Sequence, residues 1–417
     1  MTSTARRRGL RGRVTALLAV AVLSTGCAAS TGAGGVTAPS PSTDQARAIA
    51  AVVDAAMTTD HLRAAIVKVT VDGREVLRRA TGESMPGVPA SPDMHFRDGA
   101  VAISYVATAL LRLVDDGKVS LEDRVSRWLP EIPYSDQVTL GQLAQMTSGY
   151  VDYVSTPELT AAQYADPLRR FTPEELIAFG TRRPLLYPPG TNWNYSHTNY
   201  VILGLALEKT TGRPMAEFLQ DTVLRPLGLV DTVDPGTPAI PEPALHAYTA
   251  ERRQFLGIPA GGPFLEESTY WDPSWTITRG AIQTTTIDDL ATTATAVGSG
   301  TLLSPASHQA MLTRDLIGRT TTLPGCTTCF PQSSNYTYGL GVVSTGDWVM
   351  QNPMFAGEAG AFASLPSRKV AIAVAVTFDQ AAFDPTTGAY RNMADRLWRR
   401  IAATLVPDDA PPMPPGP

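Results

Sequence analysis

Lysine is rare in this chain, which holds only four in 417 residues: Lys68, Lys118, Lys209 and Lys369. None of them follows a serine three residues earlier, because those positions carry Ala65, Asp115, Ala206 and Pro366. The sequence therefore excludes a serine nucleophile with a lysine base one helical turn along the same face. A Gly-x-Ser-x-Gly turn, another setting for a reactive serine, is absent as well.

Basic residues are too few and too scattered for a nucleic-acid-binding surface. The formal net charge is −5 at pH 7, and five of the 34 basic residues stand in the first 13 positions. No later run of lysine or arginine alternates with aromatic residues, so we expect no nucleic-acid partner. The apolar content of 43% and charged content of 18% are typical of a globular protein.

The apolar run at the N-terminus, Val14 to Leu23, is too short to span a bilayer. Arginines precede it, and Ser24-Thr25-Gly26 leads to Cys27, which is typical of a secretory signal that ends at a lipidated cysteine. We expect a signal peptide over 1–26, an acylated Cys27, and anchoring to the outer face of the cell membrane. Small polar residues over 27–44 predict a flexible tether. An ordinary secretory signal with an unrelated cysteine is the alternative, and the export route stays open.

Cysteine is almost absent after Cys27, since only Cys326 and Cys329 remain. Outside the cell membrane, this Cys-Thr-Thr-Cys loop predicts a local disulfide. A redox-active pair is a second interpretation, although no thioredoxin-like pattern surrounds it. A zinc site would need two further ligands that no nearby cluster supplies, so we expect no metal.

Hydrophobic patterns predict helices and strands at both ends of the chain. The N-terminal part reads as a helix over 43–57 and a hairpin around Asp72-Gly73. A long apolar helix follows over 99–116, with Asp98 as its N-cap and Gly117 as its stop. Near the C-terminus the pattern predicts strands over 338–342, 359–365 and 370–377, then a helix over 390–405.

The segment Phe96-Arg97-Asp98-Gly99-Ala100 with Ile103 resembles the Phe-Arg-x-Gly-Ser-x-x-Lys segment of the serine β-lactamase and D-Ala-D-Ala carboxypeptidase family, which includes penicillin-binding proteins. Further stretches match that family over 138–149, 187–212, 224–232 and 283–290. The resemblance implies an α+β fold of the β-lactamase/transpeptidase type, with an antiparallel sheet flanked by helices. The sheet lobe would comprise 45–117 and 335–406, and a mostly helical lobe 118–334. Residues 407–417 form a Pro-rich tail, and we expect 410–417 to be disordered.

The same resemblance shows that the family's reactive groups are missing. Ala100 stands at the position of the nucleophilic serine and Ile103 at that of the lysine. The second motif, Tyr-x-Asn, becomes Tyr195-Ser196-His197. The third motif, Lys-Thr-Gly or His-x-Gly, becomes Glu358-Ala359-Gly360, where Glu358 would repel a carboxylate substrate.

The remaining candidates allow more than one role. Tyr195 and His197 either contact a ligand or serve packing. Asp98, Glu358 and Gly360 complete the set of expected ligand-binding residues, and two carboxylates with a histidine and a phenol would also suit an acid–base pair or a metal. No cofactor is expected.

These observations lead to one main hypothesis and two rivals. The main hypothesis is a lipid-anchored, extracytoplasmic pseudoenzyme that binds a cell-wall component, a peptide or a protein. The first rival is a divergent esterase or peptidase that uses other cleft groups. The second is a structural surface lipoprotein without a functional cleft.

Overall fold

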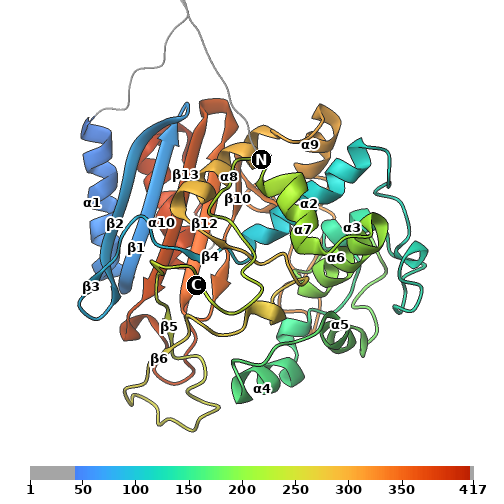
Figure 1. Ribbon diagram of the computed structural model, residues 1–417, viewed down its shortest axis with the longest axis horizontal. Helices are drawn as coiled ribbons and strands as arrows, with labels where there is room; N and C mark the ends of the chain where they lie inside the picture. Colours follow the sequence, from blue (N-terminus) through green and yellow to red (C-terminus); the bar gives the residue numbers. More distant parts are fainter. Residues whose placement is uncertain (1–42, 414–417) are drawn as a thin grey trace, which may run out of the picture. The chain divides into compact units, whose positions relative to one another are not determined.

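Apolar segments from the two ends of the chain meet in one antiparallel sheet in the computed structural model, which describes residues 43–413 (Figure 1). The strand order is β3-β2-β1-β13-β12-β10-β9-β8, and β11 also pairs with β12. The bounds are β1 Leu62–Val71, β2 Arg74–Met85, β3 Val88–Pro89, β8 Thr337–Tyr338, β9 Val343–Thr345, β10 Trp348–Gln351, β11 Met354–Phe355, β12 Glu358–Leu365 and β13 Val370–Phe378. The expected α+β fold is confirmed.

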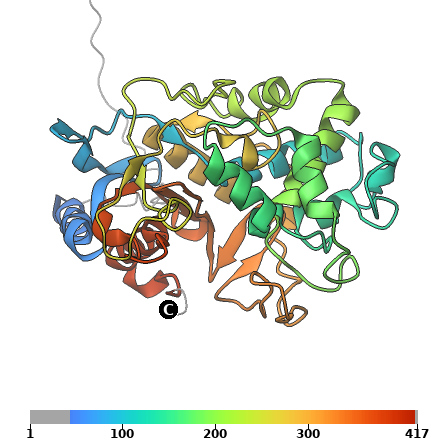
Figure 2. The same cartoon turned by 90° about the horizontal axis from the view of Figure 1, so that it is seen from below.

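Helices cover both faces of this sheet, which explains why every residue of β12 and β13 is buried. The first and last helices pack together on one face, and α8 packs on the other (Figures 1 and 2). Their bounds are α1 Thr43–Thr59, α10 Met393–Leu405 and α8 Ile287–Ser299. Helix α8 falls within the predicted helical lobe over 118–334 but packs on the sheet. The boundary between the two lobes therefore does not follow the continuous ranges that the sequence suggested.

The middle of the chain supplies further helices, most of them short, with long connections. Their bounds are α3 Leu140–Ala144, α4 Pro157–Ala165, α5 Pro173–Thr181, α6 His197–Thr211, α7 Met215–Leu219 and α9 Pro305–Met311. Single turns and one π-helical segment complete the helices: η1 Val125–Arg127, η2 Tyr153–Ser155, η3 Gln220–Leu224, η4 Pro273–Trp275, η5 Pro366–Arg368, η6 Gln380–Ala382 and η7 Pro407–Asp409. Two small ladders pair β4 Phe96–Arg97 with β7 Thr284–Thr285, and β5 Tyr248–Thr249 with β6 Glu266–Glu267.

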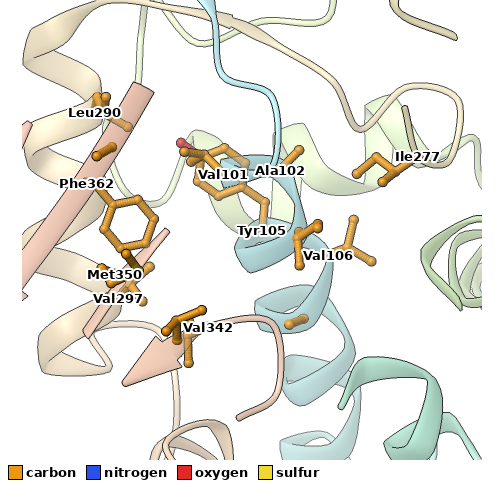
Figure 3. Packing of buried hydrophobic residues seen from close by; sticks show 14 of the residues in the cluster. Val101, Ala102, Tyr105, Val106, Ile277, Leu290, Val297, Val342, Met350 and Phe362 are labelled. Atoms are coloured by element: carbon orange, nitrogen blue, oxygen red, sulfur yellow. The ribbon is translucent and has the colours of Figure 1, made fainter. Parts of the chain in front are cut away.

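The long apolar helix is α2, Val101–Asp115, and it runs through the core. Figure 3 shows Val101 and Tyr105 of α2 close to Leu290 of α8 and Phe362 of β12, and all four are 0–1% exposed. Burial of such side chains contributes roughly 1.5–3 kcal/mol each. The start of this helix is therefore held firmly between the sheet and the helices of the middle region.

The ends of α2 confirm one expected cap and correct the other. Gly117 adopts a positive φ of 66° directly after the helix, as a C-terminal glycine stop does. Asp98, in contrast, is not the N-cap. The helix begins after Ala100, and Oδ1 of Asp98 accepts the backbone N–H of Gln283 at 2.9 Å instead. A long-range partner thus replaces the local capping bond.

The expected hairpin at Asp72-Gly73 is present between β1 and β2. The expected strand over 338–342 is wrong, because 339–342 forms the loop that joins β8 to β9. Gly341 has a φ of 74°, and a Cβ there would lie 2.4 Å from Cβ of Ala107 on α2. Close approach of α2, rather than strand propensity, therefore sets the backbone at this point.

The segment 407–413 is hydrogen-bonded to the rest of the domain, which contradicts the disorder expected over 410–413. The indole N–H of Trp348 donates to the carbonyl of Asp409 at 2.8 Å, and the Arg399 guanidinium donates to the carbonyl of Pro412. These bonds fasten the segment to β10 and α10. Residues 1–42 and 414–417, with the predicted signal peptide, Cys27 and most of the tether, lie outside the described residues. Among residues 43–413, no helix has the length and apolarity needed to cross a membrane.

Candidate functional site

A cavity of about 410 Å³ opens at the start of α2. Ala100 and Ile103 lie on its wall, one turn apart, so the structure brings the two degenerate positions to the same cavity. Ser104, the next residue along, points elsewhere: it is fully buried, and its Oγ donates to the carbonyl of Gly341 at 2.7 Å. The helix start therefore offers the cavity a methyl group and a sec-butyl group.

The second degenerate motif forms another wall. Tyr195 and His197 line the cavity at the N-terminus of α6, with their ring centroids 5.1 Å apart in an edge arrangement. Burial raises the pKa of the Tyr195 phenol, so the phenol keeps its proton at neutral pH.

His197 is oriented by Asp152, the N-cap of η2. Nδ1 of His197 lies 3.0 Å from Oδ1 of Asp152, and the backbone N–H of His197 donates to the same oxygen at 3.0 Å. The pairing favours the tautomer in which Nδ1 carries the proton and leaves Nε2 as an acceptor. Within the part of the chain that the structure describes, no protein group bonds to Nε2.

The third wall belongs to the hairpin of β10, β11 and β12. Strands β10 and β11 keep one register against β12, with Gln351 opposite Phe362 and Met354 opposite Ala359. Between them, Asn352 and Pro353 interrupt the strand and line the cavity. The turn residues Ala356 and Gly357 have φ of 36° and 86°, as a two-residue hairpin loop of the I′ type requires.

Three predicted site residues are buried near this wall or near the start of α2. Gly360 donates its N–H to the carbonyl of Pro353 at 2.9 Å, and Pro353 covers it. Glu358 is 4% exposed, and its carboxyl accepts the backbone N–H of Arg97 at 3.1 Å. Asp98 is 1% exposed beside the same segment. None of the three lines the cavity, so a ligand-contact role for them stays a prediction.

Burial governs the charge of these carboxyl groups. It raises the pKa of Glu358 to about 8, although Arg97 opposes the shift. It raises the pKa of Asp98 well above the usual range for the same reason. Glu358 is therefore largely protonated at pH 7, and burial shifts Asp98 in the same direction. Arg97 is 3% exposed, and its guanidinium donates to the carbonyl of Pro238.

Aromatic side chains make up much of the remaining wall. Trp275 stacks on Phe355 with ring centroids 5.4 Å apart and an interplanar angle of 16°. Trp193 meets Phe330 edge-on at 5.2 Å and lies 6.3 Å from Tyr336. All five rings line the cavity. They come from segments far apart in the sequence, so only the fold brings them together.

The predicted disulfide between Cys326 and Cys329 is present, with an S–S distance of 2.05 Å. The two residues inside its loop, Thr327 and Thr328, line the cavity. Thr328 also donates its hydroxyl to the carbonyl of Tyr195 at 3.3 Å. The disulfide loop thus contacts the backbone of Tyr195 and forms the same wall of the cavity.

Sequence reasoning missed Asp152, Trp193 and Trp275. Asp152 lies 45 residues before His197, and no local pattern connects the two. The two tryptophans stand in loops without periodicity. The one signal that could have pointed to them is the rarity of tryptophan, which occurs six times in the chain. Among residues 43–413, no three His, Cys, Asp or Glu side chains lie close enough together to hold a metal ion.

Comparison with curated proteins finds relatives of several activities. The chain is 34% identical over 230 residues to penicillin-binding protein 4 of Amycolatopsis lactamdurans, covering 52% of this chain and 55% of that protein. It is 32% identical over 194 residues to esterase EstB of Burkholderia gladioli, covering 43% and 49%. The chain therefore matches only about half the length of these curated relatives.

Solved structures share the fold over a larger span. The D-amino acid amidase of Ochrobactrum anthropi SV3, complexed with L-phenylalanine amide, matches with a TM-score of 0.69 at 22% identity and covers 88% of this chain and 99% of its own. A D-stereospecific amidohydrolase from Streptomyces matches with a TM-score of 0.66 at 24% identity, over 81% and 95%. Residues 49–395 match the Beta-lactamase family. Because that match spans most of the chain and agrees with the fold, this protein belongs to the Beta-lactamase family.

Proposed function

We propose that this protein is a non-acylating member of its family, a lipid-anchored protein of the cell envelope that binds a ligand in the cavity beside Ala100. The ligand would be a cell-wall component, a peptide or a segment of a protein. One observation carries the proposal: the described residues that line the cavity include neither serine nor lysine. A methyl group at Ala100 cannot attack a carbonyl carbon, and a sec-butyl group at Ile103 cannot accept a proton.

The missing serine is expected to reduce turnover far more than the remaining groups on the wall could restore. Removing the nucleophile from a serine-type acyl-transfer site lowers turnover by about a millionfold. Of the three threonines on the wall, Thr276 and Thr328 already donate their hydroxyls to the carbonyls of Pro273 and Tyr195, and Thr327 is exposed. A preserved cavity with a lost nucleophile supports binding rather than turnover.

Thermal shift with cell-wall fragments and short peptides tests the binding function. Thr327→Trp fills the cavity mouth from an exposed position, and Thr322→Trp is the matched control outside the cavity. We expect a ligand to raise the melting temperature of the wild type and of Thr322→Trp, but not of Thr327→Trp. Equal shifts of the melting temperature in all three proteins would contradict ligand binding in this cavity.

Anchoring is tested separately, because Cys27 lies outside the described residues. We expect the full-length protein to partition into detergent and to incorporate labelled fatty acid. Cys27→Ala should leave the protein in the aqueous phase. Unlabelled wild-type protein would contradict lipidation while leaving the cavity proposal intact.

One observation favours a second candidate, a divergent esterase. Among the described residues, no protein group bonds to Nε2 of His197, and Asp152 orients the ring. The imidazole would take a proton from water while the water oxygen attacks the acyl carbon, and it would then return the proton to the leaving alkoxide. Hydrolysis of p-nitrophenyl esters by the wild type, abolished in His197→Ala, would support this candidate over the first.

A further inference from the structure

The cavity wall carries no acidic side chain, lysine or arginine among its described residues. Asp98 and Glu358 are 1% and 4% exposed and do not line the cavity. Arg97 is buried beside them, with its guanidinium carbon 5.8 Å from the ring centroid of Phe355, which does line the cavity. The guanidinium of Arg97 thus packs against a ring of the wall and is not itself part of the cavity lining.

His197 does not add a net charge to the cavity wall. If its ring becomes protonated, the carboxylate of Asp152 at 3.0 Å neutralises it within the same pair. A ligand carboxylate or ammonium entering the cavity would therefore lose water without gaining an ionic partner. Such desolvation is strongly unfavourable. A neutral ligand escapes this cost.

The shape and composition of the wall favour a ring. Trp275 and Phe355 form a stacked pair on one side, and Trp193 with Phe330 and Tyr336 forms an edge-on cluster on another. Aromatic pairs contribute about 0.5–1.5 kcal/mol beyond the area that they bury. A volume of about 410 Å³ lies toward the lower end of small-molecule sites and suits a single-ring compound.

Two polar groups on the wall complement an amide. Nε2 of His197 is a hydrogen-bond acceptor when Nδ1 donates to Asp152. The side-chain amide of Asn352, a half-buried lining residue, has both a donor and an acceptor. An amide group of a ligand offers the same two functions, N–H and C=O, with no net charge.

We propose that the cavity selects neutral amides that carry an aromatic ring, and that it discriminates against the corresponding free acids. This inference rests on the proposed binding function and names its ligand class. It differs from the expectation drawn from the sequence, in which Glu358 itself would repel a carboxylate. Here the discrimination comes from the lack of an acidic side chain, lysine or arginine among the described residues that line the cavity.

Isothermal titration calorimetry with three probes tests the inference: N-acetylphenylalanine amide in both stereoisomers, N-acetylphenylalanine with its free carboxylate, and N-acetylalanine amide. We expect one stereoisomer of the aromatic amide to bind at least tenfold more tightly than either of the other two compounds. Binding of the acid as tight as that of the amide, or no binding of either aromatic amide at millimolar concentration, would overturn the inference.

Matched tryptophan variants locate the site. Trp275→Ala should weaken binding of the aromatic amide about tenfold, because the stacked pair with Phe355 is lost. Trp128→Ala removes a tryptophan outside the cavity and should leave binding unchanged. Equal weakening in both variants would contradict binding in this cavity.

The inference and the proposed function fail in different ways. If charged wall fragments raise the melting temperature in a manner that Thr327→Trp blocks, while the aromatic amide does not bind, the binding function stands and the ligand class is wrong. If the aromatic amide binds and is hydrolysed, the ligand class stands and the non-enzymatic proposal is wrong.

Discussion

Asp152 holds both the backbone and the side chain of His197 through one carboxylate. Oδ1 accepts the N–H of His197 and lies 3.0 Å from Nδ1 of its ring, and it also accepts the N–H of Val154 at 3.3 Å. The start of α6 and the cavity wall are therefore fixed by the same group. Asp152 thus positions His197, whereas the sequence motif identified His197 without this partner.

Replacement of Asp152 should cost stability as well as ring orientation. We expect Asp152→Ala to lower the free energy of unfolding by about 1–3 kcal/mol, because two half-buried N–H groups lose their acceptor. Asp152→Asn should lose less, since its amide oxygen still accepts. Urea denaturation measures both, and an alanine variant as stable as the wild type would contradict the role.

Gly341 should not tolerate a side chain. Its φ of 74° disfavours other residues, and a Cβ would lie 2.4 Å from Cβ of Ala107. We expect Gly341→Ala to lower the free energy of unfolding by about 2–4 kcal/mol. Gly212→Ala is the control, because its φ of 67° is similar but no atom lies within 4 Å of the added Cβ. It should cost only about 1–2 kcal/mol. Equal losses would mean that crowding by α2 is unimportant.

Glu358 should make stability fall as the pH rises. Burial raises its pKa in the folded state to about 8 from the ordinary 4.5, so the folded protein retains a proton that the unfolded chain releases. This contribution is complete below pH 4.5 and is lost on approach to about pH 8. Glu358→Gln should therefore flatten the profile of urea midpoints between pH 5 and pH 8. The exposed control Glu122→Gln should keep the wild-type slope. A Glu358→Gln profile parallel to the wild type would contradict a buried, protonated carboxyl.

The disulfide of Cys326 and Cys329 should contribute modestly, because it closes a short loop. Loop-closure entropy for so few residues corresponds to about 2 kcal/mol. We expect dithiothreitol to lower the urea midpoint of the wild type to that of the double variant Cys326→Ser/Cys329→Ser, which should not respond. A response of the double variant would place the effect of the reductant elsewhere.

Local patterns predicted the elements that depend on neighbours in sequence. The hairpin at Asp72-Gly73 and the glycine stop at Gly117 follow from backbone preferences that only nearby residues set. The resemblance of 96–103 to the family's Phe-Arg-x-Gly-Ser-x-x-Lys segment implied that Ala100 and Ile103 belong to the site, and both line the cavity. These features needed no knowledge of long-range packing.

Long-range contacts decided the features that the sequence did not predict. Asp98 looked like an N-cap, but its partner is the N–H of Gln283, 185 residues away. Glu358 was expected in the cleft, and whether its side chain faced the cavity or the interior depended on how the hairpin met Arg97. The aromatic wall combines residues from three distant segments, so no sequence window could reveal it.

Mass spectrometry of the intact protein after incubation with benzylpenicillin tests the central claim most directly. We predict an unchanged mass, because neither Ala100 nor any other described residue that lines the cavity provides a serine for acylation. A stoichiometric adduct with the mass of the drug would contradict the account, and peptide mapping would then identify the nucleophile.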